Sequence, residues 1–316
     1  MSVQHPPARR YRPPAPLGGR RRAQDGSMRR SAKAFGFLAP ALIVLGLFVI
    51  WPMFSALRLS FTDASGFGEP EWVGLENYAE VFTDPDLLKA VTNTALYTVL
   101  FTPTAVLAAL GLALLLNSPH LPFRGFFRTA LFVPFVVSFA VAAFAWSYLI
   151  DPHVGLLNYW LRGMGIQLGN VLQDPQLAMP AVAFVAVWKL FGFYFVIFLA
   201  GLQDIPASLY EAARMDGAGP LSRLRHVTLP LLSNTMAFVL VFAMIAALQA
   251  FDQIYVMTGG GPYGSTQTLV MEIYESGFRK LELGFASALS YVLLIATLLL
   301  SLVQFAFFGR KEKDLA

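Results

Sequence analysis

The sequence contains no cysteine, and only 13% of its 316 residues are charged. Without cysteine, disulfide bonds and thiolate metal sites are excluded. A soluble domain carries about 25% charged residues, whereas 56% of this chain is hydrophobic. A charged side chain in hydrocarbon costs at least ~2.5 kcal/mol. The shortage of charge therefore predicts an integral membrane protein.

Further absences exclude other classes of protein. No Gly-x4-Gly-Lys-Ser/Thr sequence occurs, and the run Gly259-Gly-Gly-Pro262 lacks the lysine and the preceding strand of a phosphate-binding loop. The chain therefore has no P-loop of its own for ATP. The four histidines lack metal-ligand spacing, and no catalytic set of nucleophile and base indicates an enzyme. The net charge of +4 gathers beside apolar segments, which argues against a nucleic-acid partner.

Six apolar segments are present, each near or above the ~20 residues that a helix needs to cross a bilayer. Buried helices of a soluble protein are the alternative, but six of them in this length leave too little polar surface. We therefore predict an all-α integral membrane protein with six transmembrane helices in one domain, 34–308. A disordered basic tail precedes it at 1–33, and a short tail follows at 309–316. The predicted spans are 34–57, 90–116, 130–150, 177–201, 233–253 and 284–307.

Lysine and arginine are distributed unequally between the two sides of this topology. Seventeen lie in the N-terminal tail, the loops 117–129 and 202–232, and the C-terminal tail, whereas five lie in the opposite loops. Because cytoplasmic loops carry the excess of positive charge, both termini are predicted to be cytoplasmic. The loop 58–89 is then external and is rich in acidic residues: Asp63, Glu69, Glu71, Glu76, Glu80, Asp84 and Asp86.

The stretch Glu211-Ala-Ala-Arg-Met-Asp-Gly-Ala-Gly-Pro220 is a polar island on the predicted cytoplasmic side, within the loop 203–232. The pattern predicts a helix at 206–215 whose small residues Ala212 and Ala213 permit close approach of a partner. Gly217 supplies permissive backbone geometry, and Asp216 is expected to cap the following turn. Pro220 can begin a second amphipathic stretch, 221–232.

Polar residues inside the spans are candidates for a transport path. Lys189 stands near the middle of the fourth span with Trp188 beside it, and Phe193 and Tyr194 follow about one turn later. Lys189 can bind substrate hydroxyls or an anionic group, or it can be a structural partner of a carbonyl or carboxylate. In the fifth span Gln249 can hydrogen-bond a polyol. Weaker candidates are Ser138, Trp146, Tyr148, Asn234, Asp252 and Gln253.

Several of these motifs together resemble the membrane (permease) subunits of binding-protein-dependent ABC importers. The stretch from Glu211 to Pro220 is similar to their EAA loop. The other similar motifs are Gly74-Leu-Glu-Asn-Tyr78, Asn93-Thr94, Arg128-Thr-Ala-Leu-Phe-Val-Pro134, Asp151-Pro-His-Val-Gly-Leu-Leu-Asn158 and Phe251-Asp-Gln-Ile-Tyr-Val-Met-Thr-Gly-Gly-Gly-Pro262. They follow the order of the sugar and glycerol-phosphate permeases of the maltose-transporter type. This chain has only the six-span core and lacks the additions of the larger maltose subunit.

The resemblance implies that the EAA loop forms a coupling helix that docks into an ATPase subunit. Glu211 would contact that subunit, with Ala212, Ala213, Asp216 and Gly217 shaping the contact, while Arg223 and Arg225 would meet either it or lipid headgroups. The implied partners are a second permease subunit, two ATP-binding subunits that hold ATP and Mg²⁺, an external or periplasmic binding protein, and membrane lipid. The implied cargo is a sugar, a related polyol or glycerol phosphate, and the implied location is a bacterial plasma membrane.

Two rival functions remain open from the residues alone. A secondary transporter needs intramembrane carboxylates as ion carriers, and the middle of the spans offers Lys189 but no acid. An integral membrane enzyme needs a clustered catalytic set at one membrane face, which the sequence does not display.

Overall fold

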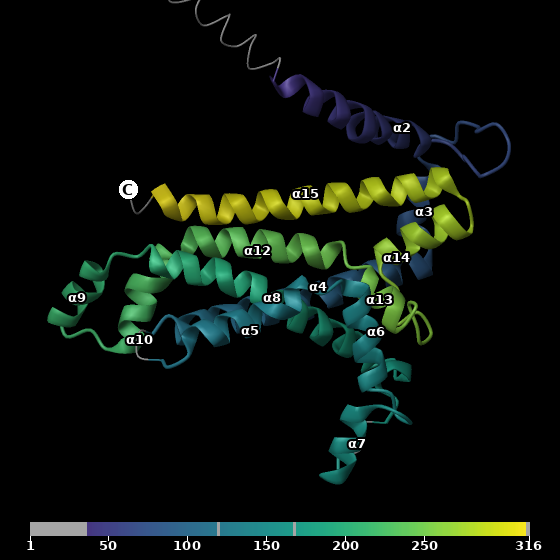
Figure 1. Ribbon diagram of the computed structural model, residues 1–316. Coiled ribbons are helices and arrows are strands. Elements are labelled where there is room, and N and C mark those ends of the chain that lie inside the picture. The colour runs from purple at the N-terminus through teal and green to yellow at the C-terminus, as the bar shows by residue number, and fades with distance from the viewer. Residues whose placement is uncertain (1–36, 119–120, 167–168, 314–316) are drawn as a thin grey trace, which may run out of the picture. The chain divides into compact units, whose positions relative to one another are not determined.

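Helices form almost all of the regular structure in the computed structural model, which describes residues 37–118, 121–166 and 169–313 (Figure 1). Among these residues, β pairing is limited to two isolated bridges, Thr62 with Trp72 and Ser65 with Glu282. The all-α fold class is therefore confirmed. The predicted tail 1–33 and residues 314–316 lie outside the described residues.

The chain divides into two units, one ending at Ser55 and the other beginning at Ala56. The first unit contains most of an apolar helix, Phe37–Leu59, that is long enough to cross a membrane. Within this helix, η1 (Gly46–Ile50) is a π-helical turn and α2 (Trp51–Leu59) is its last part.

The second unit contains the remaining helices. They are α3 (Glu76–Thr83), α4 (Pro85–Leu116), α5 (Arg124–Val136), α6 (Phe139–Leu149), α7 (Leu156–Gly163), η2 (Val171–Gln173), α8 (Ala178–Gln203), α9 (Ala207–Met215), α10 (Pro220–Arg223), η3 (Leu224–Thr228), α11 (Leu229–Leu231), α12 (Ser233–Leu248), α13 (Asp252–Met257), α14 (Leu269–Tyr274), η4 (Glu275–Arg279) and α15 (Leu283–Lys313).

Four helices can each cross a membrane unbroken, namely Phe37–Leu59, Pro85–Leu116, Ala178–Gln203 and Leu283–Phe307. Two further crossings are bent pairs. Arg124–Val136 and Phe139–Leu149 meet at 99°, and Pro220–Leu231 and Ser233–Leu248 meet at 69°. If each bent pair is counted as one crossing, the described part of the chain has six candidate spans, the number that the hydropathy pattern predicts.

The boundaries of three predicted spans need correction. The second begins at Pro85 rather than at 90, because the Asp84 carboxylate accepts the N–H groups of Asp86 and Leu87 at 2.7 and 3.3 Å and caps the helix. The fifth ends at Leu248 rather than at 253, and a separate helix, α13, follows. The last helix continues past 307 to Lys313.

The third predicted span, 130–150, is wrong as a single straight helix. The helix begins earlier, at Arg124, and ends at Val136, after which Val137 and Ser138 take extended backbone angles. Pro134 lies in the last turn of α5, where a ring without an N–H group weakens the helix. This break leaves backbone carbonyls at the end of α5 without helical donors.

The core of the second unit lies between α4 and α8. Ala105, Ala109 and Ala113 repeat every four residues on one face of α4 and are fully buried. Small residues at this spacing let helix backbones approach closely, and close approach strengthens packing where lipid supplies no hydrophobic drive. Buried hydroxyls on α4 bond within the helix, as Thr98 donates to the Thr94 carbonyl at 2.7 Å.

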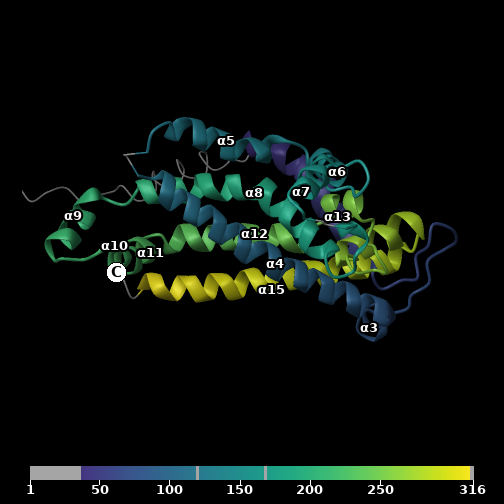
Figure 2. The ribbon, with the colours of Figure 1, turned by 90° about the horizontal axis from the view of Figure 1, so that it is seen from below.

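The ends of the second unit differ in character. In both views α9 and α10 lie at one end of the long helices, together with the C-terminal end of α15 (Figures 1 and 2). Helices α3, α7, α13 and α14 lie at the opposite end (Figures 1 and 2). The predicted cytoplasmic loop and the predicted external loops are thus separated along the long helices, as the topology requires.

Candidate functional site

Helix α9 (Ala207–Met215) confirms the helix predicted at 206–215, with Pro206 as its N-cap residue. No residue of α9 is buried. Glu211 and Ala212 are exposed and Ala213 is half-buried. Among the described residues, Glu211 has no hydrogen bond or ion pair. The face that carries Glu211 is therefore free to meet another protein.

The turn after α9 depends on Gly217, which has a positive φ of 77°. Its N–H bonds the Arg214 carbonyl, and the Ala218 N–H bonds the Ala213 carbonyl at 2.9 Å, so the helix end is satisfied. The sequence predicts that Asp216 caps the following turn, and Asp216 is the C-cap residue of α9, where its backbone N–H bonds the Ala212 and Arg214 carbonyls. Asp216 ends α9, and α10 begins after Gly219 with Pro220 in its first turn and no side-chain cap.

Helix α9 is tied to the helix that leads into the fifth span. The Tyr210 hydroxyl lies 3.1 Å from the Thr228 hydroxyl of η3. Between these helices and the end of α4 lies a cavity of about 770 Å³, lined in part by Tyr210, Glu211, Arg214 and Arg223. Arg223 therefore faces this cavity, whereas Arg225 is exposed. The Tyr210–Thr228 contact therefore links α9 to η3, which precedes α11 and α12 in the chain.

Lys189 belongs to α8, and its side chain reaches the break between α5 and α6. It is only 6% exposed, and its Nζ donates to the Phe135 carbonyl at 3.2 Å. The same ammonium lies 5.4 Å from the centre of the Phe135 ring and 4.7 Å from that of Phe139. A cation over an aromatic face is attracted by the ring quadrupole, whose negative side lies over the face of the ring. Lys189 therefore has the carbonyl partner that the sequence left as one of its alternatives.

Two other predicted residues gather around the same break. The Phe193 ring stacks on that of Phe135 at 4.8 Å. Trp188 meets Trp146, a weaker candidate from the third span, edge to face at 5.4 Å. Aromatic rings and one cation thus surround the point where the third span changes direction.

Gln249 stands apart from this group, whereas the Tyr194 ring packs edge to face on Phe193 at 5.6 Å. Tyr194 is part of the buried core, and Gln249 is an exposed residue that ends α12. The sequence pattern did not identify Phe135 and Phe139 as neighbours of Lys189. Pro134 was the available signal, because a proline can mark the end of a helix. The sequence pattern also missed the buried bond in which Gln253 Nε2 donates to the Tyr97 hydroxyl at 2.7 Å, because the partners are 156 residues apart.

Replacing Lys189 by alanine is expected to lower uptake and to lower the thermal stability of the assembled transporter. The change removes a charge-assisted hydrogen bond worth about 1.5–3 kcal/mol and leaves the Phe135 carbonyl unpaired. Uptake and the melting temperature of the purified complex measure the two effects.

The matched control for this change is Lys89→Ala, which removes an exposed lysine that donates to the Tyr263 carbonyl at 2.6 Å. Its effect on stability should be smaller, because water can replace an exposed donor. Wild-type uptake and stability in Lys189→Ala would show that Lys189 is dispensable. Normal stability with reduced uptake would assign it to the transport path alone.

At the opposite end, the segment after α13 is fastened to α4. The Asn93 side chain donates to the carbonyls of Gly264 and Gln267, both at 2.8 Å. The Leu269 N–H donates to the Thr94 hydroxyl at 2.9 Å. The Asn93-Thr94 motif is therefore bonded to residues 264–269, which follow the Phe251–Pro262 motif in the sequence.

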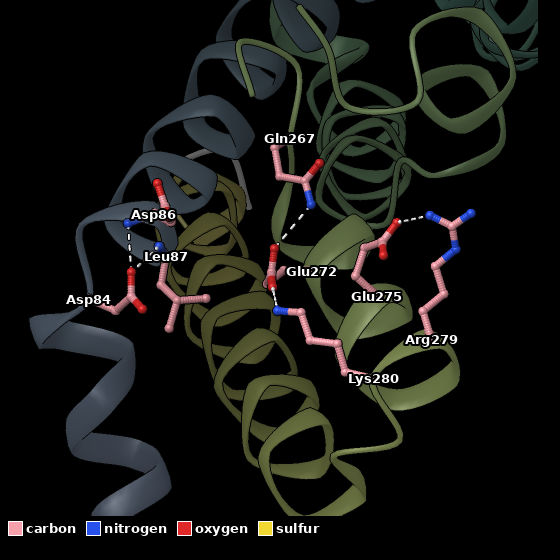
Figure 3. Close-up of polar contacts among 8 residues, drawn as sticks. All are labelled: Asp84, Asp86, Leu87, Gln267, Glu272, Glu275, Arg279 and Lys280. Carbon is pink, nitrogen blue, oxygen red and sulfur yellow. Dashed lines mark hydrogen bonds and ion pairs between the residues drawn. The ribbon is translucent and has the colours of Figure 1, made fainter. Parts of the chain in front are cut away.

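Charged side chains surround a second cavity at this end, of about 470 Å³. Lys280 lies 3.3 Å from Glu272, which also accepts a hydrogen bond from Gln267, while Arg279 pairs with Glu275 beside them (Figure 3). Partial burial acts to lower the pKa of Lys280, but the charge and hydrogen bond of Glu272 raise it overall. The cavity has five carboxylates and two lysines: Glu80, Asp84, Asp86, Glu272, Glu282, Lys89 and Lys280.

Comparison with known proteins identifies the class. Residues 86–314 match the family described as "Binding-protein-dependent transport system inner membrane component". The chain belongs to this family and is a permease subunit of an ABC importer. The ATPase of such importers is a separate subunit, so the enzyme and secondary-transporter alternatives are set aside.

Two relatives are similar along nearly their whole length. The sulfoquinovosyl glycerol permease protein SmoG of Agrobacterium fabrum is 38% identical over 87% of this chain and 90% of that protein. The sn-glycerol-3-phosphate permease protein UgpA of Yersinia pestis is 37% identical over 87% of this chain and 93% of that protein.

Solved structures of a bacterial ABC transporter for the acidic polysaccharide alginate have the same fold. One matches with a TM-score of 0.79 and 22% identity, over 91% of this chain and 99% of that chain. Another, in complex with an alginate pentasaccharide-bound periplasmic protein, matches with a TM-score of 0.78 and 22% identity, over 90% and 96%.

Proposed function

We propose that this chain is one of two permease subunits that carry a sugar, a polyol or a glycerol phosphate ester into a bacterial cell. Two ATP-binding subunits supply the energy from ATP and Mg²⁺, and an external or periplasmic binding protein delivers the substrate. The observation that carries this proposal is the free face of α9, joined to the fifth span through Tyr210 and Thr228 at 3.1 Å.

Coupling would begin at α9. Glu211 and Ala212 offer an exposed helical surface to an ATPase subunit, and half-buried Ala213 has no side chain beyond Cβ to hold the partner away. Closure of the ATPase dimer would push α9, and the Tyr210–Thr228 contact would pass the movement to η3 and α12. The 69° bend before Ser233 is the point at which this movement would change direction.

The transport path would run past the break in the third span. Phe193 and Trp188 present aromatic faces, which suit the apolar faces of sugar rings, and Lys189 supplies a cation beside them. A cation suits hydroxyl-rich or anionic cargo. The relatives' names support this class, since one carries sn-glycerol-3-phosphate and the related structures carry an acidic polysaccharide. Tyr194, whose ring packs on Phe193 at 5.6 Å, and Gln249, at the end of α12, complete the proposed path.

The orientation that we propose places both termini and α9 in the cytoplasm, with loops 58–89, 151–176 and 254–283 outside. The arrangement of the helices supports it, because α9 lies at the opposite end of the long helices from α3, α7 and α14 (Figure 2). The binding protein would then dock at the end that carries the charged cavity of about 470 Å³, some of whose residues are drawn in Figure 3.

Single cysteines in this cysteine-free chain test the orientation. A cysteine at Met215 is expected to resist an impermeant thiol reagent in intact cells and to react after lysis, because it would lie in the cytoplasm. A cysteine at Tyr263, which is 88% exposed at the other end, should react in intact cells. Labelling at position 215 in intact cells would reverse the topology.

The function as a whole is tested by purification through a tag on this chain from native membranes. We expect an ATPase and a second permease to co-purify, and the complex to hydrolyse ATP faster when its binding protein is added. Recovery of the chain without an ATPase from gently solubilised membranes would contradict the proposal. The ligand found in the binding protein would then identify the cargo.

A further inference from the structure

Helix α7 (Leu156–Gly163) has an apolar side that the described chain leaves uncovered. Leu156 and Trp160 are 57% and 62% exposed, and Leu157 and Leu161 lie at neighbouring positions of the same side. Tyr159 and Arg162 lie on the opposite side of the helix. This division into an apolar and a polar side is typical of a helix that lies in a membrane surface.

The corner before α7 holds the helix in a defined direction. The Asp151 carboxylate accepts the N–H groups of His153 and Val154 at 2.8 and 3.0 Å, and these bonds hold the pKa of Asp151 below its ordinary value. Arg162 donates to the Pro152 carbonyl at 2.6 Å. A side chain on Gly155 would collide with the carbonyls of Asp151 and Leu149. These contacts therefore fix the direction in which the apolar side of α7 faces.

An apolar groove lies between α7 and the end of α6. It has a volume of about 250 Å³ and is lined by Trp146, Leu149, Leu156, Leu157 and Trp160. No charged residue belongs to this lining. A polar ligand would lose its hydrogen bonds to water there without replacement, so the groove suits a hydrocarbon occupant.

The position of α7 relative to the long helices follows from the helices before it. The thirteen residues of α5 rise about 20 Å, which is less than the ~30 Å hydrocarbon core. The chain then turns by 99° into α6, and α7 continues away from α4, α8 and α12 (Figure 1). Helix α7 therefore lies to the side of the long helices.

The exposed surface of α6 continues this apolar character. Phe144 is 70% exposed, and Val141 and Tyr148 are exposed on the same side of the helix. Tryptophan and tyrosine are enriched at membrane interfaces, where an apolar ring and a polar atom are both satisfied. We infer that α7 lies in the external interface of the bilayer, with lipid acyl chains in the groove between α6 and α7 and Arg162 toward headgroups and water.

Spin labels on single cysteines test this inference in the transporter purified with its co-purifying subunits. Reconstitution would use nanodiscs of phosphatidylethanolamine and phosphatidylglycerol. Collisions with oxygen, which enters hydrocarbon, are compared with collisions of a water-soluble nickel chelate at Leu156, Trp160 and Arg162. Labels at Phe144 and Tyr263 give the lipid and water references, and the transporter without an added cysteine gives the background.

We expect the oxygen-to-nickel ratio at 156 and 160 to approach that at 144 and to exceed that at 162 several-fold. Ratios at 156 and 160 equal to that at 263 would place α7 in water and overturn the inference. Immobile labels with low access to both reagents would mean that a protein subunit fills the groove, which also overturns it. If the label at Trp160 prevents assembly, the labels at Leu156 and Leu157 decide the question.

Discussion

Replacing Gly192 by alanine is expected to prevent α8 from packing on α5 and to reduce the amount of assembled transporter sharply. A Cβ atom at this position would collide with the Leu131 carbonyl oxygen and lie 3.1 Å from the Phe132 Cα. These are backbone atoms that cannot rotate away, so the helices must separate. Overpacking of this kind typically costs about 1–3 kcal/mol or more. The melting temperature and yield of the purified complex measure the effect.

Gly111→Ala is the matched control, because Gly111 also lies inside a spanning helix but has no atom within 4 Å of a built Cβ. Alanine is favoured over glycine in a helix by about 0.5–1 kcal/mol, so this variant should be as stable as the wild type or slightly more. Equal melting temperatures for Gly192→Ala and Gly111→Ala would contradict the close packing of α5 against α8.

Replacing Glu211 by lysine is expected to separate ATP hydrolysis from transport while the spans still insert. Glu211 is exposed on α9 and outside every span, so the fold of this chain should tolerate the change. Reversal of a charge at a desolvated contact can cost several kcal/mol, whereas an exposed rim contact is worth at most about 1 kcal/mol. Retention of the ATPase on purification and hydrolysis stimulated by the binding protein are the measurements.

Two further variants separate a specific contact from a general change of charge. Glu211→Gln keeps the shape and removes the charge, and it should show a weaker form of the defect. Asp204→Lys makes the same reversal at an exposed residue that ends α8, and it should leave coupling closer to normal. If Glu211→Lys retains the ATPase and transports at the wild-type rate, Glu211 does not belong to the coupling contact.

Much of the architecture was predictable from local properties of the chain. A span is recognised by length and apolar composition, which are properties of consecutive residues, so the chain segments that form the candidate spans were predictable, while several of their bounds were not. The α9 helix was predictable for a similar reason, because Pro206 lies at its start and Gly217 just after its end. The same local signals do not show how one helix is oriented relative to the next, so the 99° turn after Val136 was not predicted.

The sequence by itself determined that Lys189 must face protein or water, since a charge in hydrocarbon is costly. Only the tertiary structure decided that the partner is the Phe135 carbonyl, 54 residues away. That carbonyl is available because α5 ends one residue later and leaves it without a helical donor. Composition and spacing thus determine which segments enter the membrane. Contacts between distant segments decide where a helix breaks and which groups meet there, because those contacts exist only after the chain has packed.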